Sequence, residues 1–177
     1  MYLSILVLPL LGSMVSGLLG RKVGVTGTHI VTCTCLTLAS ILATVAFYEV
    51  GICGSPVSIY LVNWLNSEFL SISWEFSFDQ VTVSLQLAVL YCSTLIHIYS
   101  ISYTAGEPHV QRFFSYLSLF TFGMLVLITG ANYFVMFVGP LNAHADFYFI
   151  YSKHSVRDPA LFIYINKYNI NYNLIIC

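Results

Sequence analysis

Four stretches without a charged residue determine what this chain can fold into. They are Met1–Gly20, Val23–Tyr48, Gln80–Gly106 and Phe113–Ala145. Each reaches or exceeds the roughly 20 residues that an α-helix needs to cross the hydrocarbon core of a bilayer. Only 7% of all residues are charged, against about 25% in average soluble domains. The sequence therefore predicts an all-α polytopic membrane protein and excludes a separate water-soluble domain.

We expect about four transmembrane helices and a broken fifth. The expected ranges are Tyr2–Leu19, His29–Tyr48, Asp79–Tyr103 and Gln111–Thr129, with a fifth helix that opens at Tyr133 and meets Gly139-Pro140. In the first helix, Ser13 and Gly17, and then Ser16 and Gly20, have the spacing that lets another helix approach closely. Gly130 is expected to end the fourth helix in a left-handed conformation.

The segment between the second and third helices has a different pattern. Leu70–Phe78 alternates apolar and polar residues at every step, which is typical of a half-buried strand. Val57–Trp64 is also rich in residues that favour strands, and Asn66-Ser67 can turn the chain between them. We therefore expect a small β-hairpin at the membrane surface, where its Trp and Tyr side chains suit the level of the lipid headgroups.

Basic and acidic residues are separated along the chain. Arg21 and Lys22 follow the first span, Arg112 follows the third, and the stretch Val23–Gln111 between them holds acidic residues but no Lys or Arg. Positive residues mark the side of the membrane from which insertion occurs. The N-terminus and the Glu49–Ser77 loop are therefore predicted on the opposite side.

The third helix carries a narrow line of polar side chains. Counted from Asp79 at about 100° per residue, Thr82, Gln86, Ser93, His97 and Ser100 fall within about 60° of arc. Because lipid surrounds such a helix, these groups must face protein or trapped water. Two interpretations remain open, namely the beginning of a proton path and ordinary hydrogen bonding between packed helices.

The proton-path interpretation needs water between its two titratable groups. Asp79 and His97 lie roughly 27 Å apart along the helix axis, so they cannot exchange a proton directly. Thr82, Gln86 and Ser93 would hold the intervening water molecules. In the packing interpretation, Asp79 caps the third helix and His97 bonds a neighbouring helix.

The remaining polar residues predict contacts rather than catalysis. Glu107, His109 and Arg112 belong to a short loop between two spans, where a salt bridge or a contact with another subunit is expected. Cys33 and Cys35 point about 200° apart on a helix, so they cannot clamp a metal ion. We expect no catalytic residue, no metal site and no cofactor-binding motif in this chain.

After Gly139 the composition changes abruptly. More than half of the residues that follow Pro140 are Ile, Asn, Tyr, Phe or Lys, and charged residues break any membrane-length run. The last residues show neither helical nor strand periodicity. We therefore divide the chain into a membrane domain, residues 1–139, and a divergent tail, residues 140–177, that is expected to be disordered.

Five ordered motifs carry a resemblance to a known family. They are Met1–Ser13, Phe78–Val83, His97–Tyr103, Pro108–Phe122 and Ile128–Asn132. Through them the chain resembles, over Met1–Gly139, the N-terminal part of chain 5 of mitochondrial NADH–ubiquinone oxidoreductase. That family consists of antiporter-like, proton-translocating subunits with many more helices than this chain contains.

The resemblance implies a multi-pass subunit of respiratory complex I in the mitochondrial inner membrane. Its partners would be the other membrane subunits and the lipid bilayer, with no nucleic acid. The chain would share in proton-translocating NADH:ubiquinone reductase activity only as part of that complex. No glycine-rich nucleotide loop or Cys cluster is present, so NADH, flavin, iron–sulfur and ubiquinone chemistry is expected in other subunits.

One departure from the family bears on proton transfer. The family continues from Phe-Val-Gly into Trp-Glu-Gly, whose glutamate carries a proton, whereas Pro140 follows Gly139 here. The abrupt change suggests truncation after Gly139, with the tail read from an intron. The alternatives are therefore a truncated, non-pumping fragment of the subunit or a small polytopic membrane scaffold.

Overall fold

The computed structural model describes residues 1–67, 70–105, 110–139 and 141 of the chain. Its elements are α1 (Tyr2–Leu18), α2 (Gly20–Ala46), the π-helical turn η1 (Phe47–Ile52), β1 (Val57–Ser67), β2 (Leu70–Phe78), α3 (Gln80–Tyr103) and α4 (Val110–Thr129). A short helix over residues 133–139 follows. The predicted helical membrane architecture with a small antiparallel sheet is confirmed. The predicted tail, apart from residue 141, lies outside the described residues.

The length and composition of the helices fit a membrane environment. In the described part of the chain, three helices are long and apolar enough to cross a bilayer: Lys22–Ile52, Gln80–Tyr103 and Val110–Thr129. α1 is a shorter apolar helix of 17 residues, close to the minimum of roughly 17 residues for a span. Large apolar side chains such as Leu18 and Leu95 are exposed on the outside of the bundle, where lipid would cover them.

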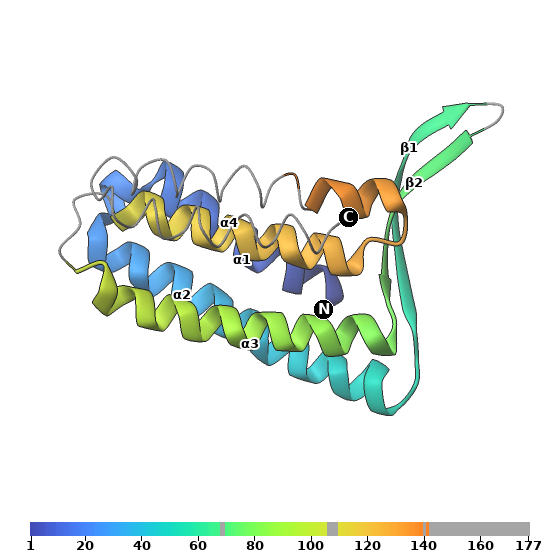
Figure 1. Ribbon diagram of the computed structural model, residues 1–177, viewed down its shortest axis with the longest axis horizontal. Helices are drawn as coiled ribbons and strands as arrows, with labels where there is room; N and C mark the ends of the chain where they lie inside the picture. Colours follow the sequence, from blue (N-terminus) through green and yellow to red (C-terminus); the bar gives the residue numbers. More distant parts are fainter. Residues whose placement is uncertain (68–69, 106–109, 140, 142–177) are drawn as a thin grey trace, which may run out of the picture.

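The helices form a bundle in which each helix packs against at least two others. α1 lies against α2 and α4, α3 lies against the same two helices from the other side, and α2 also touches α4 (Figure 1). The apolar core between them includes Leu36 and Ala43 of α2, Leu90 of α3 and Leu125 of α4. The polar face of α3 therefore points into a protein interior built by α2 and α4.

Small residues bring α1 and α4 close together, as their spacing predicts. The Ser115 hydroxyl of α4 donates a hydrogen bond to the Ser13 carbonyl oxygen of α1 at 2.9 Å. A Cβ atom placed on Gly17 would lie 2.7 Å from the oxygen of that hydroxyl, and one on Gly20 would lie 3.2 Å from the Gln111 Cβ. A larger side chain at Gly17 would therefore displace the Ser115 hydroxyl.

The beginning of α2 differs from the prediction. We expected a loop up to Thr28 and a helix from His29, but α2 begins at Gly20. The expected loop is reduced to one break at Gly24, which has φ 78° and ψ 176°, a conformation that favours glycine. The chain returns to helical geometry directly after this break, so His29 lies within α2, about one turn after Gly24.

The β-hairpin crosses one end of the bundle and extends beyond it (Figure 1). β2 has the predicted bounds, and its pairing with β1 runs from Val57 opposite Phe78 to Ser67 opposite Leu70. The turn predicted at Asn66-Ser67 is wrong, because β1 continues through both residues. Their pairing with β2 leaves only two residues for the connection, the length that hairpins most commonly use.

The segment after α4 holds the hairpin against the bundle. The backbone N–H of Ala131 donates to the Glu75 carbonyl oxygen at 3.1 Å, and the Asn132 side-chain amide donates to the Ser73 carbonyl oxygen at 2.8 Å. These bonds satisfy carbonyl groups on the outer edge of β2 that would otherwise need another partner. The hairpin is thus fixed to the same end of the bundle where α4 ends.

Gly130 ends α4 for a reason other than the one predicted. In the described residues, the glycines with positive φ are Gly24 and Gly54, so Gly130 is not left-handed. A Cβ atom on Gly130 would lie 2.9 Å from the Met136 backbone nitrogen. The glycine is required because the chain turns back tightly into the helix over residues 133–139, which confirms the predicted beginning of a fifth helix.

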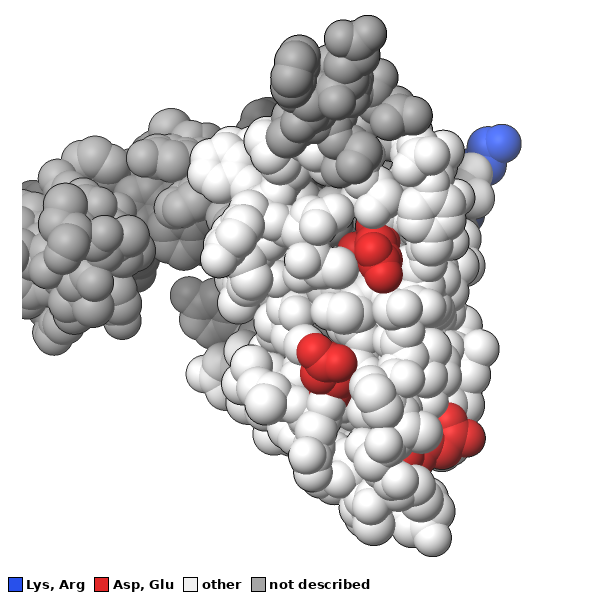
Figure 2. Space-filling view, turned by 90° about the vertical axis from the view of Figure 1, so that its right-hand side faces the viewer, with Lys and Arg blue, Asp and Glu red and all other residues white. Residues whose placement is uncertain are grey.

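Described charged groups gather at opposite ends of the bundle. Glu49, Glu75 and Asp79 belong to the hairpin end, and Figure 2 shows acidic groups spread over that end with basic groups only at its outline. Lys22 and Arg112 lie near the first residues of α2 and α4, at the other end. The fold thus keeps apart the charges that the topology prediction places on opposite sides of a membrane.

The close contact between α1 and α4 gives a first testable prediction. Gly17→Ala forces the Ser115 hydroxyl to move and breaks its hydrogen bond to Ser13, so we expect a loss of about 1 kcal/mol in the free energy of unfolding. In a Ser115→Ala background the added methyl has room, and the loss should disappear. Unfolding by SDS in mixed micelles, followed by circular dichroism, measures both. Additive effects, within about 0.5 kcal/mol, would contradict the contact.

Candidate functional site

The predicted polar line of α3 faces the interior of the bundle over most of its length. Gln86 and His97 are fully buried at 0% exposure, and Ser93 and Ser100 are each 5% exposed. Thr82 is half-buried, and Asp79 is exposed just before the first turn of the helix. The structure therefore brings the middle and the last part of the line together against α2 and α4, but leaves Asp79 outside.

The hydroxyl groups on this line are satisfied within their own helix. The Ser100 hydroxyl donates to the Ile96 carbonyl oxygen at 2.7 Å. Thr94, which is also buried and which the sequence reasoning missed, donates to the Tyr91 carbonyl oxygen at 2.8 Å. Such bonds to the preceding turn remove the need for a partner in lipid or in another helix. These hydroxyls support the packing interpretation.

His97 also bonds its own helix, which corrects the prediction that it bonds a neighbouring one. Its Nδ1 lies 2.8 Å from the Ser93 carbonyl oxygen, one turn earlier on α3. A carbonyl oxygen only accepts hydrogen bonds, so Nδ1 is assigned the proton and Nε2 becomes the acceptor of a neutral imidazole. Nε2 is buried, and no described residue provides it with a hydrogen-bond partner.

A second histidine, expected as the first residue of the second helix, shares the environment of His97. The ring of His29 on α2 meets the edge of Phe114 at a centroid distance of 4.4 Å. His97 approaches the same Phe114 ring at 6.0 Å. Phe114 is fully buried on α4, so one aromatic ring packs between two histidines from two other helices. In the sequence, both histidines lie in uncharged runs, which marks them as residues of membrane spans. It does not show that they share Phe114 as a neighbour.

Gln86 is the most unusual member of the polar face. It is fully buried, and neither its amide nitrogen nor its amide oxygen has a hydrogen-bond partner among the described residues. Its neighbours one turn away on α3, Val83 and Leu90, are fully buried apolar residues. An amide in such surroundings costs free energy until both of its polar atoms are bonded.

Asp79 has the capping role predicted for it. It is the N-cap residue of α3 and forms a capping box with Thr82. The Asp79 backbone N–H donates to the Thr82 hydroxyl oxygen at 2.6 Å. Both residues are thereby used at the beginning of the helix, and the exposed carboxylate at this end is separated by several turns from the buried imidazole of His97.

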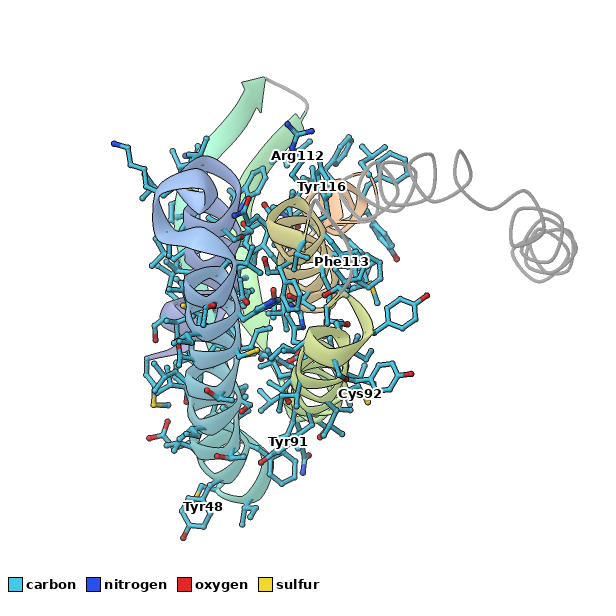
Figure 3. The ribbon with its side chains drawn as sticks, turned by 90° about the vertical axis from the view of Figure 1, so that its left-hand side faces the viewer. Tyr48, Tyr91, Cys92, Arg112, Phe113 and Tyr116 are labelled. Atoms are coloured by element: carbon cyan, nitrogen blue, oxygen red, sulfur yellow. The ribbon has the colours of Figure 1, made fainter. Side chains whose placement is uncertain are left out.

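The predicted loop contacts lie only partly in the described residues. Arg112 is exposed in the first turn of α4, and Figure 3 shows its side chain directed away from the helices. Glu107 and His109 lie outside the described residues, so their predicted contacts stay predictions. Tyr91 and Cys92 are exposed on the outer side of α3, opposite its polar face (Figure 3).

The described part of this site consists of hydrogen-bonding groups. In the part of the chain that the structure describes, no three His, Cys, Asp or Glu side chains come close enough to hold a metal ion. Among the described side chains, the buried polar atoms without a hydrogen-bond partner belong to His29, Gln86 and His97. Chemically, these groups can exchange hydrogen bonds with water or pass a proton at an imidazole nitrogen.

The ring between the two histidines leads to a prediction about stability. Phe114→Ala removes a fully buried ring and should lower the free energy of unfolding by about 3–5 kcal/mol. Phe113→Ala, one residue earlier and only half-buried, should cost much less. SDS unfolding of both variants in mixed micelles checks the comparison. Equal losses would show that Phe114 does not occupy the centre of the bundle.

The cap of α3 can be tested independently. Asp79→Ala removes the capping side chain and should cost about 0.5–2 kcal/mol. Asp79→Asn is the matched control and should retain nearly all of the stability, because Asn caps helices as well as Asp does. Thermal unfolding of the chain in detergent, followed by circular dichroism, provides the measurement. A loss of the same size in Asp79→Asn would mean that the charge matters rather than the cap.

Comparison with known proteins agrees with the motifs in the sequence. Residues 64–114, which include β2, α3 and the beginning of α4, match the family described as NADH-Ubiquinone oxidoreductase (complex I), chain 5 N-terminus. The chain is 62% identical over 139 residues to NADH-ubiquinone oxidoreductase chain 5 of Mycosarcoma maydis. The corresponding proteins of Rhizopus stolonifer and Cryphonectria parasitica are 61% and 58% identical over the same length.

These matches cover 78% of this chain but 21% of each of the three relatives. The chain thus spans about a fifth of the length of the curated relatives it matches. The predicted resemblance is confirmed: the N-terminal part of this chain is related to the N-terminal part of NADH-ubiquinone oxidoreductase chain 5.

Proposed function

We propose that this chain serves as the N-terminal helices of a subunit in the membrane arm of proton-pumping NADH:ubiquinone oxidoreductase. The observation that carries the proposal is the identity of 62% over 139 residues with a chain 5 protein. The apolar outer surface of the bundle supports a membrane location. The membrane in question would be the mitochondrial inner membrane, and the partners would be the other membrane subunits of the complex.

The redox steps belong to other subunits in this proposal. NADH, flavin, iron–sulfur clusters and ubiquinone would all be bound elsewhere in the complex. The chain's own contribution would be structural support for the membrane arm, together with its share of a polar interior through which protons move. Gln86 and His97 are the residues proposed for that interior, because they are buried and retain atoms that can bond water.

A purely structural role is the second candidate, and one observation favours it. Buried hydroxyl groups such as those of Ser100 and Thr94 are satisfied within α3 itself, as expected of a helix that only packs. In this alternative, the chain is a polytopic scaffold that joins the complex without taking part in proton transfer. Assembly and pumping therefore have to be measured separately.

Assembly is tested with the tagged 177-residue chain expressed in fungal mitochondria. We expect it to comigrate with the large complex on native gels of solubilised inner membranes. A control variant with Asp in place of Leu36 and Leu90, two fully buried core residues, should not comigrate, since two buried unpaired charges disrupt the bundle. Migration of the unaltered chain only as a small, separate species would contradict the proposal.

Pumping is tested in a chimera in which the N-terminal part of this chain replaces the matching part of the Mycosarcoma maydis protein. We expect NADH oxidation with normal proton uptake in the chimera and reduced uptake per NADH in its His97→Leu variant. The matched control is Tyr99→Leu, an exposed position on the same helix. Unchanged uptake in His97→Leu, with normal assembly, would leave the scaffold role.

A further inference from the structure

Three side chains in the interior of the bundle present polar atoms that the described protein does not satisfy. They are both amide atoms of Gln86, Nε2 of His97 and Nδ1 of His29. Burying a polar group without a hydrogen bond costs about 1–3 kcal/mol in proteins, and no bulk water reaches the middle of a bilayer to reduce that cost. A stable bundle therefore requires a partner for each of these atoms.

The two α3 side chains cannot satisfy each other. From residue 86 to residue 97 the helix rises about 16 Å, which is far beyond any hydrogen bond. Each side chain is 0% exposed, so bulk solvent and lipid headgroups are excluded as well. The partner at each level must be small enough to fit between packed helices.

α2 and α4 are the helices that pack against the face of α3 that carries Gln86 and His97. His29 and His97 pack on the same Phe114 ring, so residue 29 of α2 lies near residue 97 of α3. Because α2 and α3 run in opposite directions (Figure 1), the same step along α2 leads from His29 to Ser40. Ser40 is buried, and its hydroxyl donates to the Thr37 carbonyl oxygen at 2.8 Å. The Ser40 oxygen can also accept a hydrogen bond, and counting 11 residues from His29 on α2 and from His97 on α3 leads to Ser40 and Gln86.

Water can supply the hydrogen bonds that Gln86 and His97 lack. Gln86 offers an amide donor and a carbonyl acceptor, and a buried water molecule usually makes about three hydrogen bonds to such groups. At the other level, His97 Nε2 is an acceptor, since Nδ1 faces the Ser93 carbonyl oxygen. A water molecule can donate to it.

We propose that the bundle interior contains two internal water-binding sites, one held by Gln86 between α2 and α3 and one held by His97 beside Phe114. Together they would hydrate one face of α3 at two positions separated by the fully buried Leu90. The inference depends only on contacts within α2, α3 and α4. It therefore holds or fails independently of whether the chain joins the respiratory complex.

The direct test is magnetisation transfer from water to side chains by solid-state NMR. The full 177-residue chain, labelled in Gln, His and Leu, is reconstituted in phosphatidylcholine bilayers. We expect the Gln86 amide and the His97 ring to receive water magnetisation nearly as fast as the exposed Gln80 amide. The methyl groups of Leu90, which are equally buried on the same helix, should receive it several-fold more slowly. Gln86→Met identifies the Gln86 signal by its loss.

Transfer to Gln86 and His97 as slow as transfer to Leu90 would overturn the proposal, because both sites would then be dry. This comparison uses the unaltered chain, so it does not depend on the folding of a variant.

A second measurement distinguishes a Gln86 amide that is bonded to water from one that has no hydrogen-bond partner. If Gln86 lies dry, Gln86→Met removes an unsatisfied polar group at nearly constant volume and should reduce the unfolding equilibrium constant tenfold or more. If water satisfies the amide, the constant should stay unchanged or rise. Gln111→Met, at a half-buried position on α4, is the matched control. Strong stabilisation by Gln86→Met alone would contradict the water site.

Discussion

Everything in this bundle depends on pairing polar groups inside a protein whose outer surface is apolar. A helix surrounded by lipid can carry a hydroxyl inward only when the oxygen has a partner. The structure meets this requirement mostly with short bonds back to the preceding turn, as in Thr32 to the Thr28 carbonyl oxygen on α2 and Ser118 to the Phe114 carbonyl oxygen on α4. Such bonds let polar residues occupy a tightly packed interior without fixing which helix lies opposite.

The length of a side chain decides whether this solution is available. Ser and Thr hydroxyls reach the carbonyl group one turn earlier, and so does Nδ1 of His97. The amide of Gln86 and the far nitrogen of the His97 ring extend beyond their own helix. On the described polar line of α3, buried side-chain atoms without a hydrogen-bond partner therefore belong to these two residues, although the line contains several more.

The ends of the bundle are organised by different interactions from its interior. At one end, the hairpin is tied to the chain after α4 by backbone and side-chain hydrogen bonds to Glu75 and Ser73. The described acidic groups gather at this end, and Lys22 and Arg112 lie near the other. An interior satisfied mostly by local bonds, with charges at the ends, suits a bilayer.

Features that depend on a few neighbouring residues could be predicted from the sequence. The limits of α3 differ from the prediction by one residue, because Asp79 caps one end of the helix and the other end falls at Tyr103 as predicted. The alternating pattern of β2 likewise gave its bounds correctly. The conformations at Gly24 and Gly130 were harder to predict. A glycine can mark a break, a turn or a close contact, and only the surrounding chain decides which of these it is.

By itself, the sequence determined the membrane class, the helix and strand pattern, the cap on α3 and the inward-facing polar line. These follow from local periodicity and from the length of the uncharged runs. Only the tertiary structure decided that His29 and His97 share the ring of Phe114, that His97 bonds its own helix, and that Gln86 is left unpaired. The reason is physical, because the partners of a buried group lie on helices that are distant in the sequence. The periodicity of residues within one helix does not encode which faces of two helices meet.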